Sequence, residues 1–246
     1  NINNINPFST RNLEFNVEGP LVTEKLFYNL TARDIYYQGV FEGQRLFNPQ
    51  NISYFDQEDN FNLHRLEIIG DDTLNPGKGD GAFVPMNWNR KTYLQGKLIY
   101  RHSPFTKLKY TLINDDVSYQ DYNRMYRYNP DGNLKRYRYG LTQLLQLNHT
   151  FSTKTFLNAG ITHFKKSYQH RTYDRDKWDQ YVHPKLLNSQ PYSFLTGGTD
   201  LSVFSRETST STFKADLTSQ WNSKNKIKLG VEFRQHQLNF NDYSLR

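Results

Sequence analysis

Aromatic and basic side chains gather in the polar stretches of this sequence, where they could bind a ligand. Arg127, Arg136, Tyr137, Arg138 and Tyr139 belong to this pattern. Aromatic faces next to guanidinium groups suit sugars, peptides or chelates, with stacking and cation–π contacts of about 0.5–2 kcal/mol each. The same rings could instead pack long loops against one another. The candidates for ligand contact are Trp88, Tyr122, Arg124, Tyr126, Tyr128 and Trp178.

Three aspartates could bind a cation through their oxygen atoms. Asp71, Asp72 and Asp80 lie in a glycine-rich stretch, and carboxylates are ligands that Ca²⁺ prefers. Their spacing does not match an EF-hand loop, because no Glu closes it at the twelfth position. A solvated turn explains the stretch equally well. The sequence therefore offers a weak calcium candidate and predicts no metal site.

The sequence contains no motif that is typical of covalent catalysis. The chain has no Cys, so it lacks a thiol nucleophile, a thiolate metal site and a disulfide framework. Its seven His are dispersed without an H-E-x-x-H pair, and no G-x-S-x-G elbow, P-loop or paired catalytic carboxylates occur. We expect a protein that is not an enzyme and has no cofactor.

Composition narrows the class further. The 246 residues include 18 Tyr, 17 Phe and 3 Trp, which argues against disorder, and the net charge is +7. The positive charges are scattered along the chain rather than concentrated in runs, so we expect no nucleic-acid partner. The apolar runs are far shorter than the roughly 20 residues of a spanning helix. A transmembrane strand, however, needs only about 9–11 alternating residues.

Alternation with period two dominates the chain. Ile227, Leu229, Val231 and Phe233 fall on one side of an extended strand, and the charged residues between them fall on the other. A second alternating segment, 213–221, precedes it across a polar turn at 222–226. These two segments predict a hairpin.

Three further hairpins repeat the plan, at 13–32, 94–112 and 145–161. We therefore predict about eight strands of about ten residues each, joined in pairs by tight turns. The connections between hairpins are long, running from Gln38 to Lys91, from Ser118 to Gly140 and from Lys166 to Ser211. Because consecutive hairpins place their tight turns at one end of a sheet, the long loops must share the other end.

This asymmetry is typical of outer-membrane barrels, which combine short turns at one end with long loops at the other. Alternation alone does not say which face points outward, since a soluble barrel has the opposite sense. Charges such as Lys214, Asp216, Lys228 and Glu232 on the polar side suit a water-filled lumen. Aromatic residues near the strand ends suit interfacial girdles. Both features favour lipid outside and water inside.

Several segments, in order, resemble the barrel of TonB-dependent outer-membrane receptors, of the type that carries a carboxypeptidase-regulatory-like domain. The first is Asn12-Leu13-Glu14-Phe15-Asn16-Val17-Glu18-Gly19-Pro20-Leu21, followed by Lys25-Leu26-Phe27-Tyr28. The remaining segments, spread over nearly the whole chain, are Gly43-Gln44-Arg45-Leu46-Phe47-Asn48-Pro49, Phe83-Val84-Pro85-Met86-Asn87, Tyr128-Asn129-Pro130-Asp131-Gly132, Tyr181-Val182-His183-Pro184 and Lys228-Leu229-Gly230-Val231-Glu232-Phe233-Arg234.

The resemblance implies a fold and a function. Receptors of this kind form a 22-stranded transmembrane barrel filled by an N-terminal plug, so residues 1–246 are expected to be an early barrel portion without the plug. The implied function is energised uptake of a siderophore, vitamin, glycan or peptide across the cell outer membrane. The implied partners are the TonB energising complex acting through the plug, outer-membrane lipid, the substrate and, in some relatives, a surface lipoprotein.

Two alternatives stay open at this point. A small, complete eight-stranded outer-membrane barrel, acting as an adhesin or structural protein, fits the strand count. It requires the first and last strands to pair, whereas a barrel portion leaves both as unpaired edges. A soluble carbohydrate-binding β-domain also fits the alternation, and it requires the apolar face to be buried.

Overall fold

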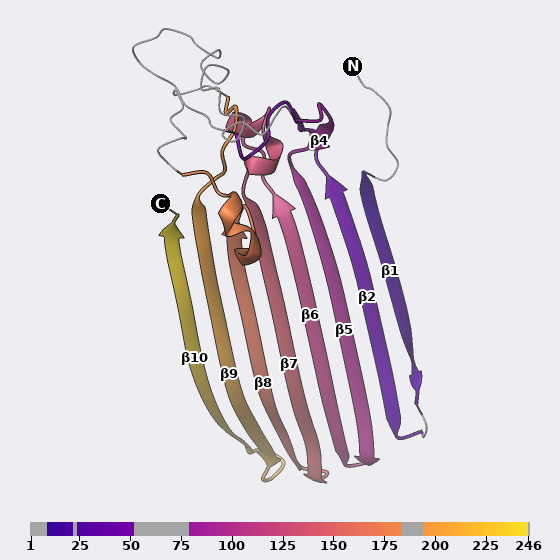
Figure 1. The fold of residues 1–246 in the computed structure, drawn as a ribbon. Coiled ribbons are helices and arrows are strands. Elements are labelled where there is room, and N and C mark those ends of the chain that lie inside the picture. Colours follow the sequence, from indigo (N-terminus) through magenta and orange to yellow (C-terminus); the bar gives the residue numbers. More distant parts are fainter. Residues whose placement is uncertain (1–8, 22–23, 52–78, 184–193, 246) are drawn as a thin grey trace, which may run out of the picture.

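The computed structural model describes residues 9–21, 24–51, 79–183 and 194–245, and these ranges are dominated by one antiparallel sheet (Figure 1). The alternating segments all become strands of this sheet, because alternation separates their apolar and polar side chains onto two faces. The eight strands are β1 (Thr10–Pro20), β2 (Leu26–Gln38), β5 (Trp88–Ser103), β6 (Thr106–Gln120), β7 (Lys135–Ser152), β8 (Thr155–Arg171), β9 (Ser202–Gln220) and β10 (Lys226–Ser244).

The strands follow one another as a meander, in the order β1-β2-β5-β6-β7-β8-β9-β10. Tight connections at 21–25, 104–105, 153–154 and 221–225 lie at one end, and the long connections at 39–87, 121–134 and 172–201 lead away from the other (Figure 1). The predicted all-β class, the strand number and the one-sided loop placement are therefore confirmed.

The predicted strand length was wrong. The strands contain 11 to 19 residues rather than about ten, and the long connections are correspondingly shorter than expected. The extra residues lie toward the loops, as in the last part of β10, where Gln237, Asn239 and Asn241 replace the apolar side chains of the alternating pattern. Backbone pairing with the neighbouring strand continues there although the hydropathy pattern has ended.

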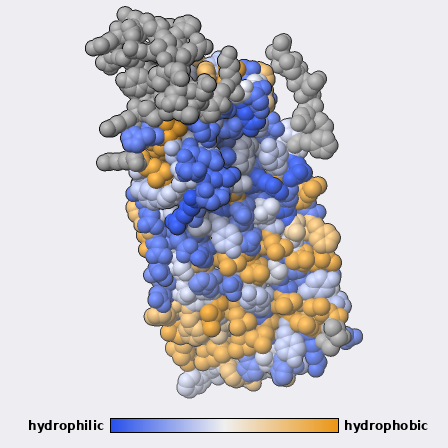
Figure 2. Space-filling view, viewed as in Figure 1, coloured by the Kyte–Doolittle hydropathy of each residue, from blue (hydrophilic) through white to orange (hydrophobic). Residues whose placement is uncertain are grey.

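One face of the sheet, here called the apolar face, carries cross-strand rows of apolar side chains. Residues directly opposite in neighbouring strands share a face, so the register defines each row. One row runs through Phe233, Phe213, Ile161, Leu145, Tyr110, Leu98 and Tyr28. Figure 2 shows hydrophobic side chains gathered over the half of the sheet near the tight turns, and hydrophilic ones toward the loops.

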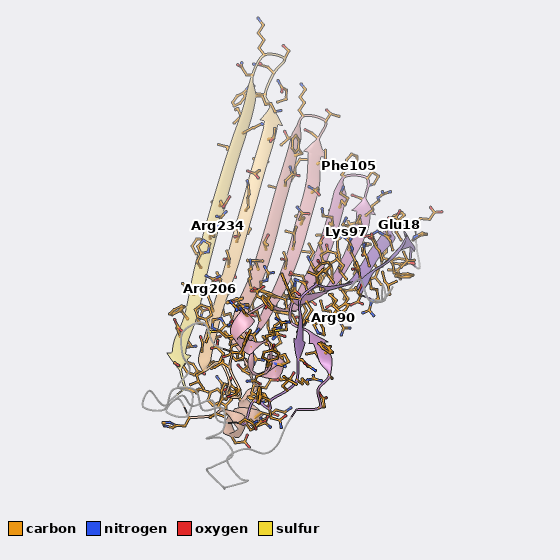
Figure 3. All side chains as sticks on the ribbon, turned by 90° about the horizontal axis from the view of Figure 1, so that it is seen from above. Glu18, Arg90, Lys97, Phe105, Arg206 and Arg234 are labelled. Carbon is orange, nitrogen blue, oxygen red and sulfur yellow. The ribbon has the colours of Figure 1, made fainter. Side chains whose placement is uncertain are left out.

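The opposite face, here called the polar face, carries ion pairs and side-chain hydrogen bonds. Lys214 Nζ lies 4.0 Å from Glu232, whose carboxylate accepts a 2.6 Å bond from Arg234. At the other edge, Arg33 donates to Asn12 at 2.9 Å and lies 3.8 Å from Glu14. Figure 3 shows side chains of both faces, with Arg206 near the loop end and Arg234 further toward the tight turns.

The sheet is open: within the described ranges, β1 pairs with β2 alone and β10 with β9 alone. The two predicted unpaired edges are thus present. The apolar side chains are uncovered, with Phe15 58% exposed, Leu229 63% and Phe233 66%. The described helices are three 3₁₀ segments, and no helix in these ranges is long and apolar enough to cross a membrane.

Candidate functional site

The described parts of the three long connections fold together into one unit, here called the loop cap (39–51, 79–87, 121–134, 172–183 and 194–201). It contains the short ladder of β3 (Glu42–Gln44) with β4 (Phe83–Pro85) and the 3₁₀ helices η1 (Arg124–Tyr126), η2 (Pro130–Gly132) and η3 (Arg175–Gln180). Met86, Tyr126 and Leu195 form a buried cluster, one residue from each connection. Burying apolar surface from all three connections joins them into a common core.

Backbone groups hold the connections together as well. Gln44 N–H donates to Arg127 O at 2.8 Å, which joins the first connection to the second. Leu195 N–H donates to Met125 O at 2.8 Å, and Asp200 N–H donates to Gly132 O at 2.9 Å, which join the third to the second. These bonds satisfy polar groups that the loops withdraw from water.

An ion-pair network within the loop cap joins its first two connections. Arg45 Nε donates to Asp131 at 2.7 Å, and Arg45 Nη1 lies 3.6 Å from Asp80. The hydrogen bond with Asp131 is the largest cause of the raised pKa of Arg45, partly opposed by desolvation. Asp80, a member of the calcium candidate, thus has a cation partner and also accepts a bond from Ala82 N–H.

The other two members of that candidate, Asp71 and Asp72, lie outside the described residues. Within the described ranges, no group of three or more His, Cys, Asp or Glu side chains is arranged to hold a metal ion. The weak calcium candidate therefore gains no support from the described part of the chain.

Tyr122 and Tyr126, two ligand candidates, pack inside the loop cap. Tyr126 is 6% exposed in the buried cluster, and burial raises the pKa of its phenol because the charged form would lose its hydration. Tyr122 packs against the same cluster and stacks on Phe41 with ring centroids 4.5 Å apart. These two rings support the loop-packing interpretation.

Arg124, Tyr128 and Trp88 also have partners within the chain. Phe194 lies between the first two, with its centroid 4.9 Å from the Tyr128 ring and 5.4 Å from Arg124 Cζ. Trp88 begins β5, and its Nε1–H donates to Gln120 Oε1 at 3.0 Å. Arg124 is exposed, so it stays open to further contacts, whereas Trp88 mainly ties two strand ends together.

Trp178 packs apart from the other candidates. Its ring meets Tyr243 of β10 edge to face at 6.3 Å, and Arg175 lies 5.9 Å from the ring centroid. The six predicted residues thus belong to several packing groups rather than to one continuous binding surface. No single site is formed by all of them.

The register reveals a second group, of which the sequence pattern named only Arg136 and Arg138. On the polar face near the loops, one cross-strand row alternates guanidinium and aromatic groups: Arg138, Tyr168, Arg206 and Phe240. The next row toward the loops contains Tyr119, Arg136, His170, Phe204 and Asp242. Neighbours in these rows are 17 to 38 positions apart in the sequence, so only the pairing register brings them together.

The aromatic members of these rows touch one another. The ring centroid of Phe204 lies 5.6 Å from that of Tyr168 and 5.3 Å from that of Phe240. It also lies 5.3 Å from the centroid of His170, whose ring is stacked on it. His170 Nε2 lies 2.9 Å from Ser202 Oγ, and its Nδ1 lies 3.3 Å from the Tyr168 hydroxyl. The cluster is therefore fixed from several sides and forms a firm platform.

Comparisons of the chain with protein-family models, with curated proteins and with solved structures find no match in any of the three.

Proposed function

We propose that the chain is an early portion of a large transmembrane β-barrel belonging to a TonB-dependent receptor of the outer membrane. In this proposal the apolar face meets lipid and the polar face lines a water-filled lumen. The loop cap stands on the cell exterior and the tight turns on the periplasmic side. The chain's contribution is to form barrel wall and external loops rather than to carry out a reaction.

The observation that carries the proposal is the course of the apolar residues across the sheet. In β1 they are centred on Phe15, whose cross-strand row reaches β10 at Gln237. In β10 they extend from Ile227 to Phe233 and are centred near residue 230, seven residues away from Gln237 (237 − 230). The apolar band therefore crosses the rows diagonally.

The slope of this band has the size that a membrane barrel needs. Seven residues over seven strand-to-strand steps is about one residue per step, or about 3.3 Å along the strand for every 4.8 Å across it. If the band is level with the membrane, the strands tilt by about 35°. Strands of transmembrane barrels tilt by about 35–45°.

The borders of the band agree with the same interpretation. Beyond it, on the apolar face, charged groups begin: Arg11 pairs with Asp34 at 2.5 Å, and Lys165 pairs with Glu207 at 2.9 Å. Charged side chains are costly at the bilayer midplane and far less so near its interfaces. The apolar face is thus apolar near the tight turns and charged near the loops. This distribution suits a barrel whose strands extend beyond the outer leaflet.

The open sheet favours a larger barrel over a complete eight-stranded one. A closed barrel of these strands would require β1 and β10 to pair, and each of them has one partner in the described part of the chain. The uncovered apolar face weighs against the soluble β-domain, which would bury it. Uptake itself, the TonB complex and the plug follow from the resemblance and are part of the proposal.

Lipid insertion is the first test. Ile161 of β8 is 55% exposed on the apolar face, while its neighbour Thr162 lies on the polar face. Arg at a lipid-facing midplane position costs about 2–4 kcal/mol. We expect Ile161→Arg to lower the fraction of chain that floats with lipid vesicles in a density gradient, and Thr162→Arg to leave it close to the unsubstituted value. Equal flotation of both variants would argue against lipid contact.

Uptake is tested in the cell, with the receptor that contains this chain. We expect deletion of that receptor to abolish growth on, or accumulation of, its substrate, and loss of TonB to have the same effect. Ile161→Arg should reduce the amount of receptor in the outer membrane. Uptake that persists without TonB would contradict the energised mechanism while leaving the barrel intact.

A further inference from the structure

The row formed by Arg138, Tyr168, Arg206 and Phe240 offers positive charge and aromatic surface on the same side of the sheet. Each member belongs to a different neighbouring strand, so adjacent members are about 4.8 Å apart at the backbone. Arg138 and Arg206 therefore flank Tyr168 with a backbone separation of about 10 Å. Figure 3 places Arg206 near the loop end of the sheet.

In the described part of the chain, no carboxylate forms an ion pair with either of these two guanidinium groups. Arg138 and Arg206 are exposed, and within the described ranges neither forms an ion pair, unlike Arg136, which binds Asp121 at 2.9 Å. Arg138 lies 5.0 Å from the Tyr119 ring centroid, an arrangement that orients the guanidinium without satisfying its charge. Both groups keep donors free for an anion.

The platform also keeps apolar surface in contact with water. Phe240 is 58% exposed and Leu238, one row nearer the tight turns, is 64% exposed, although both point to the polar face. The row lies seven residues beyond Phe233 (240 − 233), about 23 Å along β10 from the end of the apolar band. Lipid contact therefore does not explain the exposure of Phe240 and Leu238.

We infer that this platform binds an anion that carries a ring: carboxylate or sulfate groups bind the two arginines while the ring lies on Tyr168 and Phe240. A guanidinium fork matches the two oxygens of such groups and binds them more strongly than neutral partners do. Aromatic carboxylates and acidic sugars both offer this combination. The inference rests on the proposed function only in taking this ligand to be the substrate for uptake.

The test is calorimetric titration of the full chain in detergent micelles at fixed ionic strength. Benzene-1,3,5-tricarboxylate represents aromatic anions, and a sulfated disaccharide represents acidic sugars. Inorganic phosphate is the control with charge but no ring, and maltose is the control with rings but no charge. We expect one of the two ring-bearing anions to bind at least tenfold more tightly than phosphate or maltose. The tighter of the two identifies the source of the ligand.

Variants locate the site. Arg206→Gln removes an exposed, unpaired group, so folding should persist, and we expect about tenfold weaker binding. Tyr168→Leu should weaken binding of the ring-bearing anion and leave that of phosphate unchanged. The matched controls are Arg101→Gln and Tyr93→Leu, on the polar face of β5, with binding unchanged.

The inference would be overturned if phosphate bound as tightly as both ring-bearing anions, or if Arg101→Gln weakened binding as much as Arg206→Gln. The inference would also be overturned if neither ring-bearing anion bound at millimolar concentration. None of these outcomes depends on vesicle flotation. Failure of the platform and failure of the membrane proposal are therefore separate results.

Discussion

The side chain of Asn129, which is fully buried, donates a 2.7 Å hydrogen bond from Nδ2 to the backbone carbonyl of Gly198, 69 residues further along the chain. This bond joins the second long connection to the third. It lies next to Gly132, whose approach to the Gly198 carbonyl leaves no room for a Cβ atom. The two connections are thus in direct backbone contact at this point.

Replacing Asn129 with Ala should loosen the loop cap. The substitution leaves the Gly198 carbonyl buried without its donor, and such losses cost about 1–3 kcal/mol. We expect faster amide hydrogen exchange at 194–201, measured by mass spectrometry, and little change within β6 and β7. Asn158→Ala is the control, because it removes a 2.6 Å bond to Asn148 that is exposed on the sheet. Equal effects of both variants would contradict a special role of the buried bond.

Gly43 marks a second close approach within the loop cap. A Cβ atom on this residue would lie 2.7 Å from Met86 Sδ and 2.8 Å from the Arg127 carbonyl oxygen. Gly43→Ala should therefore push the first connection away from the second and increase cleavage of the loops by a protease. Gly96 of β5 has no atom within 4 Å of the same position, so Gly96→Ala should leave cleavage unchanged. Similar cleavage of both variants would show that the cap tolerates this displacement.

Alkaline pH should weaken the loop cap through Tyr126, whose pKa is raised by burial. Below pH 10 the folded and unfolded chains both keep the phenolic proton, so this group adds no pH dependence. Above pH 10 the unfolded chain loses the proton while the folded chain keeps it, and stability falls by up to about 1.4 kcal/mol per pH unit.

The measurement is the urea midpoint for loss of near-ultraviolet circular dichroism at pH 9 and pH 11. In the unsubstituted chain, the urea midpoint should be lower at pH 11 than at pH 9. In Tyr126→Phe this decrease should be smaller. Tyr173, whose pKa is raised mainly by burial, remains in both proteins and accounts for part of the decrease. An equally large decrease of the urea midpoint in Tyr126→Phe would contradict the assignment to Tyr126.

Much of the sheet could be predicted because its signal is local. Alternation such as Ile227, Leu229, Val231 and Phe233 occurs wherever one face meets an apolar environment, and the short polar turns give the pairing of consecutive strands. The signal ends where the side chains of the apolar face become polar, and in β10 the apolar Leu238 and Phe240 lie on the polar face instead. The last third of β10, and the continuation of the other strands toward the loops, therefore could not be predicted from hydropathy.

The candidate site was harder to predict, because its contacts are long-range. Nothing in the sequence indicates that Phe194 fills the space between Arg124 and Tyr128, or that Asn129 reaches a carbonyl of the third connection. The row from Arg138 to Phe240 depends on register over four strands, since a shift by one residue would move these side chains to the other face. Composition identified the residue types, but the pairing determined which of them meet.

Closure of the sheet can be tested cleanly because the chain contains no native Cys. Lys214 and Glu232 are directly opposite in β9 and β10, so the pair Lys214→Cys and Glu232→Cys should form a disulfide on mild oxidation. Asn16→Cys with Lys228→Cys would instead connect the two edge strands β1 and β10, because closure at the slope of the apolar band places Asn16 opposite Lys228. A sheet that is part of a larger barrel keeps these positions far beyond disulfide reach, so we expect no intramolecular bond. Gel mobility without reducing agent reports both pairs, and efficient cross-linking of the second pair in vesicles would favour the complete eight-stranded barrel.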